Sequence, residues 1–388
     1  MFVSQIKLKN WRDFRKVDVM IGDRVFLVGP NASGKSNFLD VFRFLRDIAK
    51  PGGGLQKAVF DRGGISKLRC LSARKEPEIE IEVHLSEFSD KSPLWKYSIG
   101  IKQESRGYRK PYLTKEKVIT GNREILVRPD KNDKQDKLRL TQTHLEQINA
   151  NEKFRDISEF FSTILYFHLI PQLLQHPNDF LPALESPEDP FGKSFLKRIG
   201  DAYQNVRESR LRKIQKALQL AVPQLTQLSY ITDAKEGGIP HLEAIYEHWR
   251  PNAGRQREDQ FSDGTLRLIA LLWSLLDRDS LLLFEEPELS LHTGIVSKLP
   301  SLMHRLLSKK KKKRQVILST HSTELLSDKA IGGDEVLILS PDREGTTIKI
   351  ASSIIEIKLL LEAGMSVADA VIPHTEPPNS IQLELFDG

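Results

Sequence analysis

The stretch Gly29-Pro30-Asn31-Ala32-Ser33-Gly34-Lys35-Ser36 decides the fold of this chain of 388 residues. An apolar run at residues 25–28 precedes it, and apolar residues at helical spacing follow it from Phe38 to Leu45. This order of strand, glycine-rich loop and helix is the context that the phosphate-binding P-loop motif requires. The two glycines let successive backbone N–H groups face one anion, and the helix N-terminus adds its positive dipole. The stretch therefore predicts a binding site for a nucleoside triphosphate.

The polar residues of the motif have predicted roles at that site. Lys35 can reach the β- and γ-phosphates of ATP, and the Ser36 hydroxyl suits Mg²⁺. Nucleotide contacts are assigned to Gly29, Asn31, Ser33, Gly34, Lys35, Ser36 and Asn37. Upstream, Arg12 is assigned to the phosphates and Trp11 could pack on adenine, although packing of Trp11 within the protein is an equally weighted alternative.

Composition describes a folded, water-soluble protein. Hydrophobic residues make up 39% of the chain and charged residues 28%, which is typical of globular domains. Cys70 is the single cysteine, so an internal disulfide is excluded and a reducing cytoplasm is the expected location. The longest apolar run, residues 268–276, is too short for a bilayer span, and the first residues lack the order of a signal peptide. No membrane contact is expected.

The pattern along the chain predicts an α/β fold with two added parts. Two strands with a turn between them are expected in residues 2–28. Alternating runs at 78–85, 95–103 and 125–128 predict an antiparallel β subdomain with one wet face. Residues 143–221 favour helices interrupted by prolines, the best of them at 195–222. From residue 266 the chain alternates helices (266–276, 294–307) with apolar strands (280–284, 315–319), and a strand pair follows at 336–340 and 346–350.

An acidic pair follows the buried strand at 280–284. A P-loop ATPase needs one acid for the metal ion and one carboxylate to position water. Glu285 occupies the position of the metal-associated acid, and Glu286 is the candidate general base. Pro287 enforces a turn that can aim the two adjacent side chains differently.

Two further motifs complete a recognisable order. Ser262-Asp263-Gly264-Thr265 precedes the helix at 266–276, and Thr320-His321-Ser322 follows the strand at 315–319. With the P-loop and the Glu-Glu-Pro-Glu stretch, this order resembles the ABC-type ATPases of the RecF/SMC-like class. It is most similar to compact members without a long coiled coil, from bacterial DNA repair and phage-defence loci. The resemblance covers residues 1–50 and 255–372.

The resemblance implies roles that the motifs alone do not give. Ser262 and Gly264 would touch the γ-phosphate bound to the opposite protomer, His321 would sense that phosphate, and Glu286 would polarise the attacking water. Glu285 departs from the more frequent aspartate. The implied fold is an α/β P-loop ABC-ATPase head with an antiparallel β subdomain and a helical insertion. Its expected parts are residues 1–142, an insertion at 143–254, a C-terminal lobe at 255–372 and a flexible tail at 373–388.

The resulting functional hypothesis is an ATP-hydrolysing switch that forms a homodimer on ATP and gates a DNA-acting partner in repair or phage defence. DNA and a separate effector or nuclease chain are the candidate partners. A nucleotide-gated scaffold with little hydrolysis is the main alternative, because Glu285 replaces an aspartate. A transporter subunit ranks lower, since Lys35 and Thr265 are 230 positions apart.

Two charged or apolar segments lie outside these motifs. Residues 309–314 supply six positive charges, equal to the net charge of +6, and favour a solvated loop over a DNA contact. The tail carries Gln382, Leu383, Leu385 and Phe386 in an order that resembles the peptides by which bacterial proteins dock on the sliding clamp. A fold-back edge strand and chance occurrence remain the alternatives for this tail.

Overall fold

The computed structural model describes residues 1–73, 76–88, 92–105, 107–175, 189–233, 238–248, 250, 254–277, 280–308 and 314–375. The chain forms two compact units. The first comprises Met1–Ile164, Lys313–His321 and Ile331–Gly388, and the second comprises Leu165–Lys312 and Ser322–Ala330. The expected boundary at residue 142 therefore falls inside the first unit, and the range 255–372 contributes to both.

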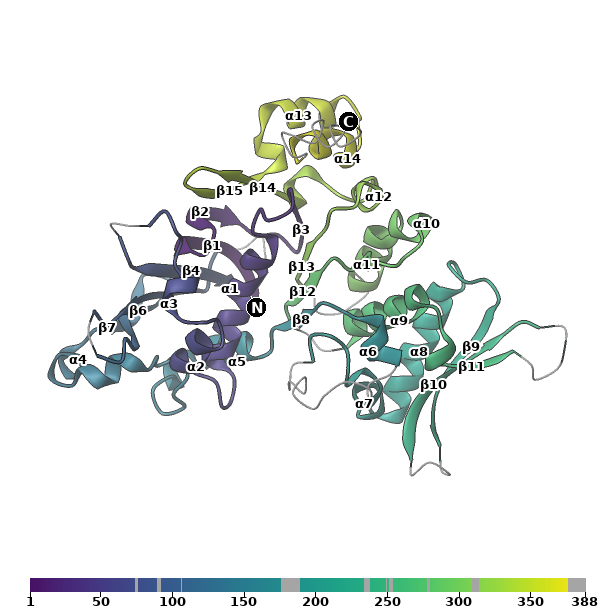
Figure 1. Ribbon diagram of the computed structural model, residues 1–388, viewed down its shortest axis with the longest axis horizontal. Helices are drawn as coiled ribbons and strands as arrows, with labels where there is room; N and C mark the ends of the chain where they lie inside the picture. The colour runs from purple at the N-terminus through teal and green to yellow at the C-terminus, as the bar shows by residue number, and fades with distance from the viewer. Residues whose placement is uncertain are drawn as a thin grey trace, which may run out of the picture. The chain divides into compact units, whose positions relative to one another are not determined.

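A six-stranded antiparallel sheet dominates the N-terminal part of the first unit (Figure 1). Its order is β2-β1-β4-β5-β6-β7. The strands are β1 (Phe2–Trp11), β2 (Phe14–Met20), β4 (Ile79–Ser86), β5 (Trp95–Gln103), β6 (Pro111–Thr120) and β7 (Arg123–Arg128). Along the middle of β1 and the first half of β4, buried residues alternate with more exposed ones, as expected for a sheet with one covered face. This confirms the predicted antiparallel β subdomain.

A second set of strands in the same unit holds the P-loop. The fully buried β3 (Arg24–Val28) pairs in parallel with β13 (Val316–Ser319) and with β14 (Val336–Asp342), and β15 (Gly345–Ile350) pairs antiparallel to β14. Apolar strands of this kind are typical of a parallel sheet covered on both faces. The helices of this unit are α1 (Lys35–Ala49), α2 (Leu55–Phe60), α3 (Ile65–Leu68), α4 (Lys131–Gln135), α5 (Arg155–Ser162), α13 (Ile355–Glu362) and α14 (Val367–Val371).

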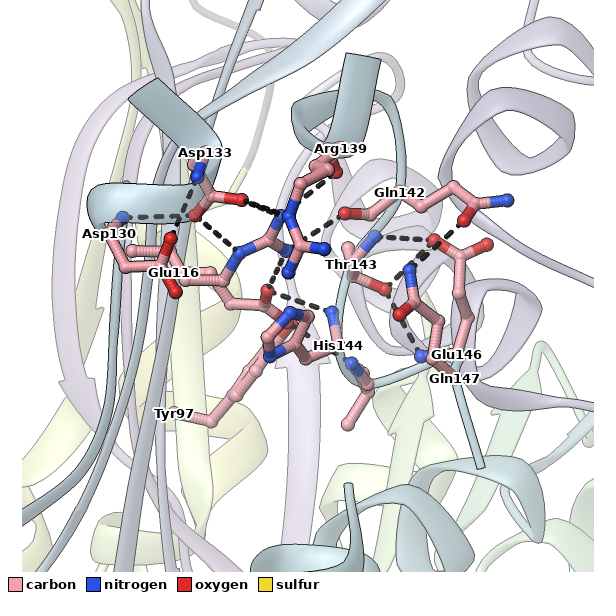
Figure 2. A network of polar contacts seen from close by, with 12 residues as sticks. Tyr97, Glu116, Asp130, Asp133, Arg139, Gln142, Thr143, His144, Glu146 and Gln147 are labelled. Carbon is pink, nitrogen blue, oxygen red and sulfur yellow. Dashed lines mark hydrogen bonds and ion pairs between the residues drawn. The ribbon is translucent and has the colours of Figure 1, made fainter. Parts of the chain in front are cut away.

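Strand β6, which the sequence pattern does not reveal, is held by a buried polar network (Figure 2). Glu116 is fully buried in the middle of β6, and the Arg128 guanidinium donates to Glu116 at 2.9 Å and to Asp133 at 2.8 Å. Tyr97 of β5 also donates to Glu116, at 3.2 Å. An ion pair thus occupies a position where period-two alternation predicts an apolar side chain.

The second unit combines a short parallel strand pair with a separate small sheet. Strand β8 (Leu165–Phe167) pairs with β12 (Leu282–Glu285). The small antiparallel sheet has the order β11-β10-β9, with β9 (Leu225–Asp233), β10 (Ile239–Tyr246) and β11 (Arg255–Arg257). The helices are α6 (Pro171–Gln175), α7 (Phe195–Gly200), α8 (Gln204–Leu218), α9 (Asp263–Leu276), α10 (Thr293–Val296), α11 (Leu299–Ser308) and α12 (Thr323–Leu326).

Two expected helices are each divided in the structure. The pattern at 195–222 becomes α7, which ends at Gly200, and α8, which begins at Gln204; a β-carbon at Gly200 would lie 2.4 Å from the Tyr230 hydroxyl. The pattern at 294–307 becomes α10 and α11, because Pro300 is tolerated only in the first turn of a helix. The expected helical insertion, 143–254, contains α7 and α8 but also the strands β9 and β10.

Some sequence predictions concern residues that the structure does not describe. Residues 309–313 of the basic run and the tail residues Gln382, Leu383, Leu385 and Phe386 lie outside the described ranges. Arg314, the last residue of that run, is described and is buried. Among the described residues, no helix is both long enough and apolar enough to cross a membrane.

Candidate nucleotide-binding site

The P-loop has the predicted local form. Strand β3 ends at Val28, Gly34 adopts a left-handed φ of 91°, and α1 begins at Lys35. A β-carbon at Gly29 would lie 2.4 Å from the Leu339 carbonyl oxygen of β14, so only glycine fits where the strand ends. The loop backbone is thus shaped by two positions that exclude larger residues.

The side chains of the loop fit a phosphate group. The Lys35 ammonium donates to the carbonyl oxygens of Gly29 and Pro30, both at 2.9 Å, and so lies folded over the loop. The Ser33 hydroxyl is buried and has no hydrogen-bond partner among the described residues. A buried hydroxyl, a lysine cation and a helix N-terminus all suit an oxyanion. Ser36, the residue expected at Mg²⁺, is exposed in the first turn of α1.

The turn between β1 and β2 packs against α1. Trp11 is fully buried, donates through Nε1 to the Asn37 carbonyl oxygen at 2.9 Å and packs on Phe44 with ring centroids 5.1 Å apart. Of the two open interpretations, the structure supports packing within the protein, since a buried ring cannot stack on adenine. Asn37 donates to Asp13 of the same turn at 2.5 Å.

Arg12 is bound to an acidic residue of α1. Its guanidinium donates to Asp40 at 2.7 and 3.1 Å, and Arg62 donates to the same carboxylate at 3.0 Å. Burial alone would raise the pKa of Asp40, but Arg62 and Arg12 outweigh it and lower that pKa below its usual value. Arg12 therefore lies beside α1, the helix that follows the P-loop, and its partner in this structure is Asp40.

His321 lies beside the P-loop strand. Strand β13 runs parallel to β3 with Ser319 opposite Leu27, and the Thr320 amide donates to the Leu27 carbonyl oxygen at 3.1 Å. His321 follows directly and is exposed. The first unit thus brings together the P-loop, Arg12 and His321.

The acidic pair stands at the end of β12 in the second unit. Glu285 is the last residue of the strand, and Glu286 has a left-handed φ of 43°, which is uncommon for a residue with a side chain. The Tyr166 hydroxyl of β8 donates to Glu285, a contact that follows from the register that places Tyr166 opposite Leu283.

The signature residues begin helix α9 in the same unit. Ser262 is the N-cap, and its hydroxyl accepts a hydrogen bond from the Thr265 amide at 3.3 Å. A β-carbon at Gly264 would lie 2.6 Å from the Ser290 carbonyl oxygen, which belongs to the loop after the acidic pair. Ser262 and Gly264 are therefore held next to the segment that follows Glu286.

Three residues that sequence reasoning missed anchor the signature residues and the loop after the acidic pair. Gln172 and Gln175 of α6 donate to Asp263 at 3.1 and 3.3 Å. Arg267, on α9, donates to the Leu289 carbonyl oxygen at 2.9 Å and to the Leu169 carbonyl oxygen at 2.5 Å. An arginine within an otherwise apolar helical stretch is the sequence signal that could have identified this link, and in the structure Arg267 is 7% exposed.

Comparison with known families gives the identity of this arrangement. Residues 24–327 match the family described as "AAA domain, putative AbiEii toxin, Type IV TA system". The chain belongs to this family. The match spans the P-loop, the signature, the acidic pair and His321, so all four motifs lie within the range of one family model. No curated protein matches the sequence.

The family member also resembles solved heads of SMC proteins. The SMC head bound to the C-terminal winged-helix domain of ScpA is 15% identical with a TM-score of 0.52, over 90% of this chain and 98% of that one. The SMC head domain from Thermotoga maritima is 14% identical with a TM-score of 0.48, over 90% and 99%. An SMC head with an extended coiled coil, bound to ScpA derived from Pyrococcus furiosus, is 15% identical with a TM-score of 0.49, over 94% and 100%.

At this identity the likeness concerns the fold. It confirms the predicted α/β fold of an SMC-like head, because the match to the first of these heads extends over 90% of this chain and 98% of that one. The family of AAA ATPases implies nucleotide binding by this chain. The individual site residues remain predictions, and their geometry is compatible with the assigned chemistry.

Proposed function

We propose that this protein is an ATP-hydrolysing switch that dimerises head to head on ATP and gates a separate DNA-acting chain in DNA repair or phage defence. The observation that carries the proposal is the phosphate loop, where left-handed Gly34 opens α1 and the Lys35 ammonium lies over the loop carbonyls. The exposed position of the helix start at Ser36 leaves room for further contacts to a phosphate.

Each candidate residue has one task in this proposal. Lys35 and the loop amides bind the phosphates, and Glu286 accepts the proton of the attacking water. Ser262 and the amides at the start of α9 complete the cage around the γ-phosphate of the partner protomer, and His321 reports its presence. Mg²⁺ supplies charge neutralisation at the phosphates, and Ser36 and Glu285 are the residues that would hold it.

The proposal is tested by three variants that separate binding, hydrolysis and action across the dimer. Glu286→Gln keeps size and hydrogen bonding but removes the base, so we expect a stable dimer by light scattering at saturating ATP and Mg²⁺. Lys35→Ala abolishes binding of a fluorescent ATP analogue. Ser262→Arg keeps that binding but blocks hydrolysis, since the serine acts on the opposite subunit. A monomeric Glu286→Gln variant, or equal loss of nucleotide binding in Lys35→Ala and Ser262→Arg, would contradict the shared site.

The second candidate function is a nucleotide-gated scaffold with little hydrolysis. The hydrogen bond from Tyr166 to Glu285 favours the scaffold, because Glu285 has a longer side chain than the more frequent aspartate and this bond holds its carboxylate at β8. The measured turnover separates the two candidates: a switch driven by hydrolysis turns over faster than about once per minute, whereas a scaffold stays ATP-bound for longer. The sliding clamp is a further proposed partner, on the sequence of residues 382–386 alone.

A further inference from the structure

Two exposed aromatic rings stand at one groove of the first unit. Phe60, the last residue of α2, is 81% exposed, and Tyr108, in the loop between β5 and β6, is 92% exposed. Both line a groove of about 730 Å³. A folded protein has no packing reason to present two aromatic rings to water around one hollow, and such rings commonly mark a binding surface.

Positive charge accompanies the rings. Lys57 and Lys110 line the same groove, and the Lys110 ammonium lies 5.8 Å from the centre of the Tyr108 ring. Of the described residues that line the groove, Asp61 alone is acidic, and it contacts Lys57 at 3.6 Å. Exposed rings interleaved with lysines match the needs of one ligand class, a single-stranded nucleic acid, whose bases stack and whose phosphates carry the negative charge.

The groove is built on fixed elements. Gln56 of α2 donates to the carbonyl oxygens of Pro111 and Thr141 at 2.8 and 2.7 Å, and Glu146 accepts from the Leu55 amide at 3.2 Å. Arg128 holds the segment that contains Thr141, through hydrogen bonds to the carbonyl oxygens of Arg139 and Gln142. Helix α2 is thus pinned to β6 and to the segment after β7, and the ring of Phe60 has a rigid base.

The turn after α2 leaves the groove open. Gly63 and Gly64 adopt left-handed φ angles of 79° and 90°, and a β-carbon at Gly64 would meet no atom of the described residues within 4 Å. An uncovered glycine backbone next to an aromatic ring allows close approach of a sugar-phosphate chain. On the other side, Gln103 donates to the Arg109 carbonyl oxygen at 2.9 Å and holds the base of the loop that carries Tyr108.

We propose that this groove binds single-stranded nucleic acid, with Phe60 and Tyr108 stacking on bases and Lys57 and Lys110 contacting phosphates. The inference extends the proposed function by giving the chain its own contact with DNA. It does not depend on ATP hydrolysis, because no described residue that lines the groove belongs to the P-loop, the signature or the acidic pair.

The test is a fluorescence-anisotropy titration of the full chain, without nucleotide, against a labelled oligo-thymidine of about 15 nucleotides. Matched arms use an RNA oligonucleotide and a duplex of the same length. We expect the single strands to bind more tightly than the duplex. Phe60→Ala and Tyr108→Ala each weaken binding by roughly 5- to 150-fold, the range measured for loss of one stacked base. Phe60→Trp retains binding, because a larger ring still stacks.

Salt and a distant tyrosine provide the controls. Lys57→Ala and Lys110→Ala each reduce the slope of log affinity against log salt by about 0.7, as expected for one lost phosphate contact on a single strand. Tyr203→Ala removes an aromatic ring that is 84% exposed on the second unit and leaves affinity unchanged. Melting temperature and binding of a fluorescent ATP analogue, measured on the same variants, show that the fold and the nucleotide site are intact.

Three results would overturn the proposal. They are no binding of any single strand below about 100 µM at low salt, a preference for duplex, or equal effects of Phe60→Ala and Tyr203→Ala. In each case the exposed rings would be left as a surface for a protein partner. A failure here with normal ATP binding is distinguishable from failure of the proposed ATPase, which the Lys35 and Glu286 variants test separately.

Discussion

The phenol of Tyr166 donates to Glu285 and so helps to orient the acid assigned to the metal ion. The identity of Glu285 is readable from sequence because it ends an apolar strand after a P-loop. Tyr166 is not readable, because it lies 119 positions away and reaches Glu285 only through the parallel register of β8 and β12. The motif thus predicts the ligand residues, and the neighbour that orients one of them appears only in three dimensions.

Replacing Tyr166 tests whether that orientation matters. Tyr166→Phe removes one hydroxyl from the acid, so we expect the Mg²⁺ concentration for half-maximal ATPase activity to rise by roughly 10- to 100-fold, as for other partners of metal ligands. Binding of a fluorescent ATP analogue without Mg²⁺ stays unchanged, since the P-loop is untouched. Tyr246→Phe, on β10, is the matched control. An unaltered Mg²⁺ dependence in Tyr166→Phe would show that Glu285 needs no such support.

At the scale of elements, α1 and α2 are joined by buried charges. Asp40 of α1 binds Arg62, which follows α2, and Arg62 also donates to Asp47 at 2.8 Å. The side chains of Asp40 and Arg62 are each 7% exposed. The strand and helix patterns of α1 and β3 were predicted because they are apolar and periodic. The ion pairs and β6 were not, because a buried pair replaces apolar residues without leaving a periodic signal.

This network predicts a pH dependence of stability. The folded pKa of Asp40 is lower than its unfolded value, so its contribution is present above pH 4 and is lost as pH falls through the folded pKa. We expect Asp40→Asn to lower the free energy of unfolding by about 2 to 4 kcal/mol at pH 7, because it leaves the nearly buried Arg62 and the half-buried Arg12 with less compensation. The difference in the free energy of unfolding between wild type and Asp40→Asn narrows below about pH 4.

Denaturant unfolding at several pH values measures this effect. Asp61→Asn is the matched control: its carboxylate is 48% exposed beside Lys57, so we expect a change below about 1 kcal/mol at any pH. A constant difference between wild type and Asp40→Asn from pH 7 to pH 3 would contradict an electrostatic role and would assign the loss to packing.

At the scale of the whole molecule, the ion pairs of Asp40 with Arg12 and Arg62 connect the phosphate loop to the groove that Phe60 lines. Arg12 reaches it from the turn beside the phosphate loop, and Arg62 reaches it from the end of α2, two residues after Phe60. The general fold of the ATPase was predicted from four motifs in order, since their spacing reports a shared domain. The groove was not predicted, because α2 and the β5–β6 loop are 48 positions apart at Phe60 and Tyr108.

This arrangement predicts that ATP and single-stranded nucleic acid influence each other. In Glu286→Gln, ATP joins two subunits and so presents two grooves, and we expect affinity for a long oligo-thymidine to rise by about 10-fold or more. Thermodynamic linkage then requires the oligonucleotide to raise the apparent affinity for ATP by the same factor. Anisotropy titrations in both directions measure the two factors.

With Asp40→Asn added, each ligand still binds alone, but the part of the factor that passes through Arg12 and Arg62 is lost. Asp61→Asn in the same background keeps the full factor. If Asp40→Asn leaves the coupling untouched, the two sites communicate only through dimerisation, and short oligonucleotides that occupy one groove will show no response to ATP at all.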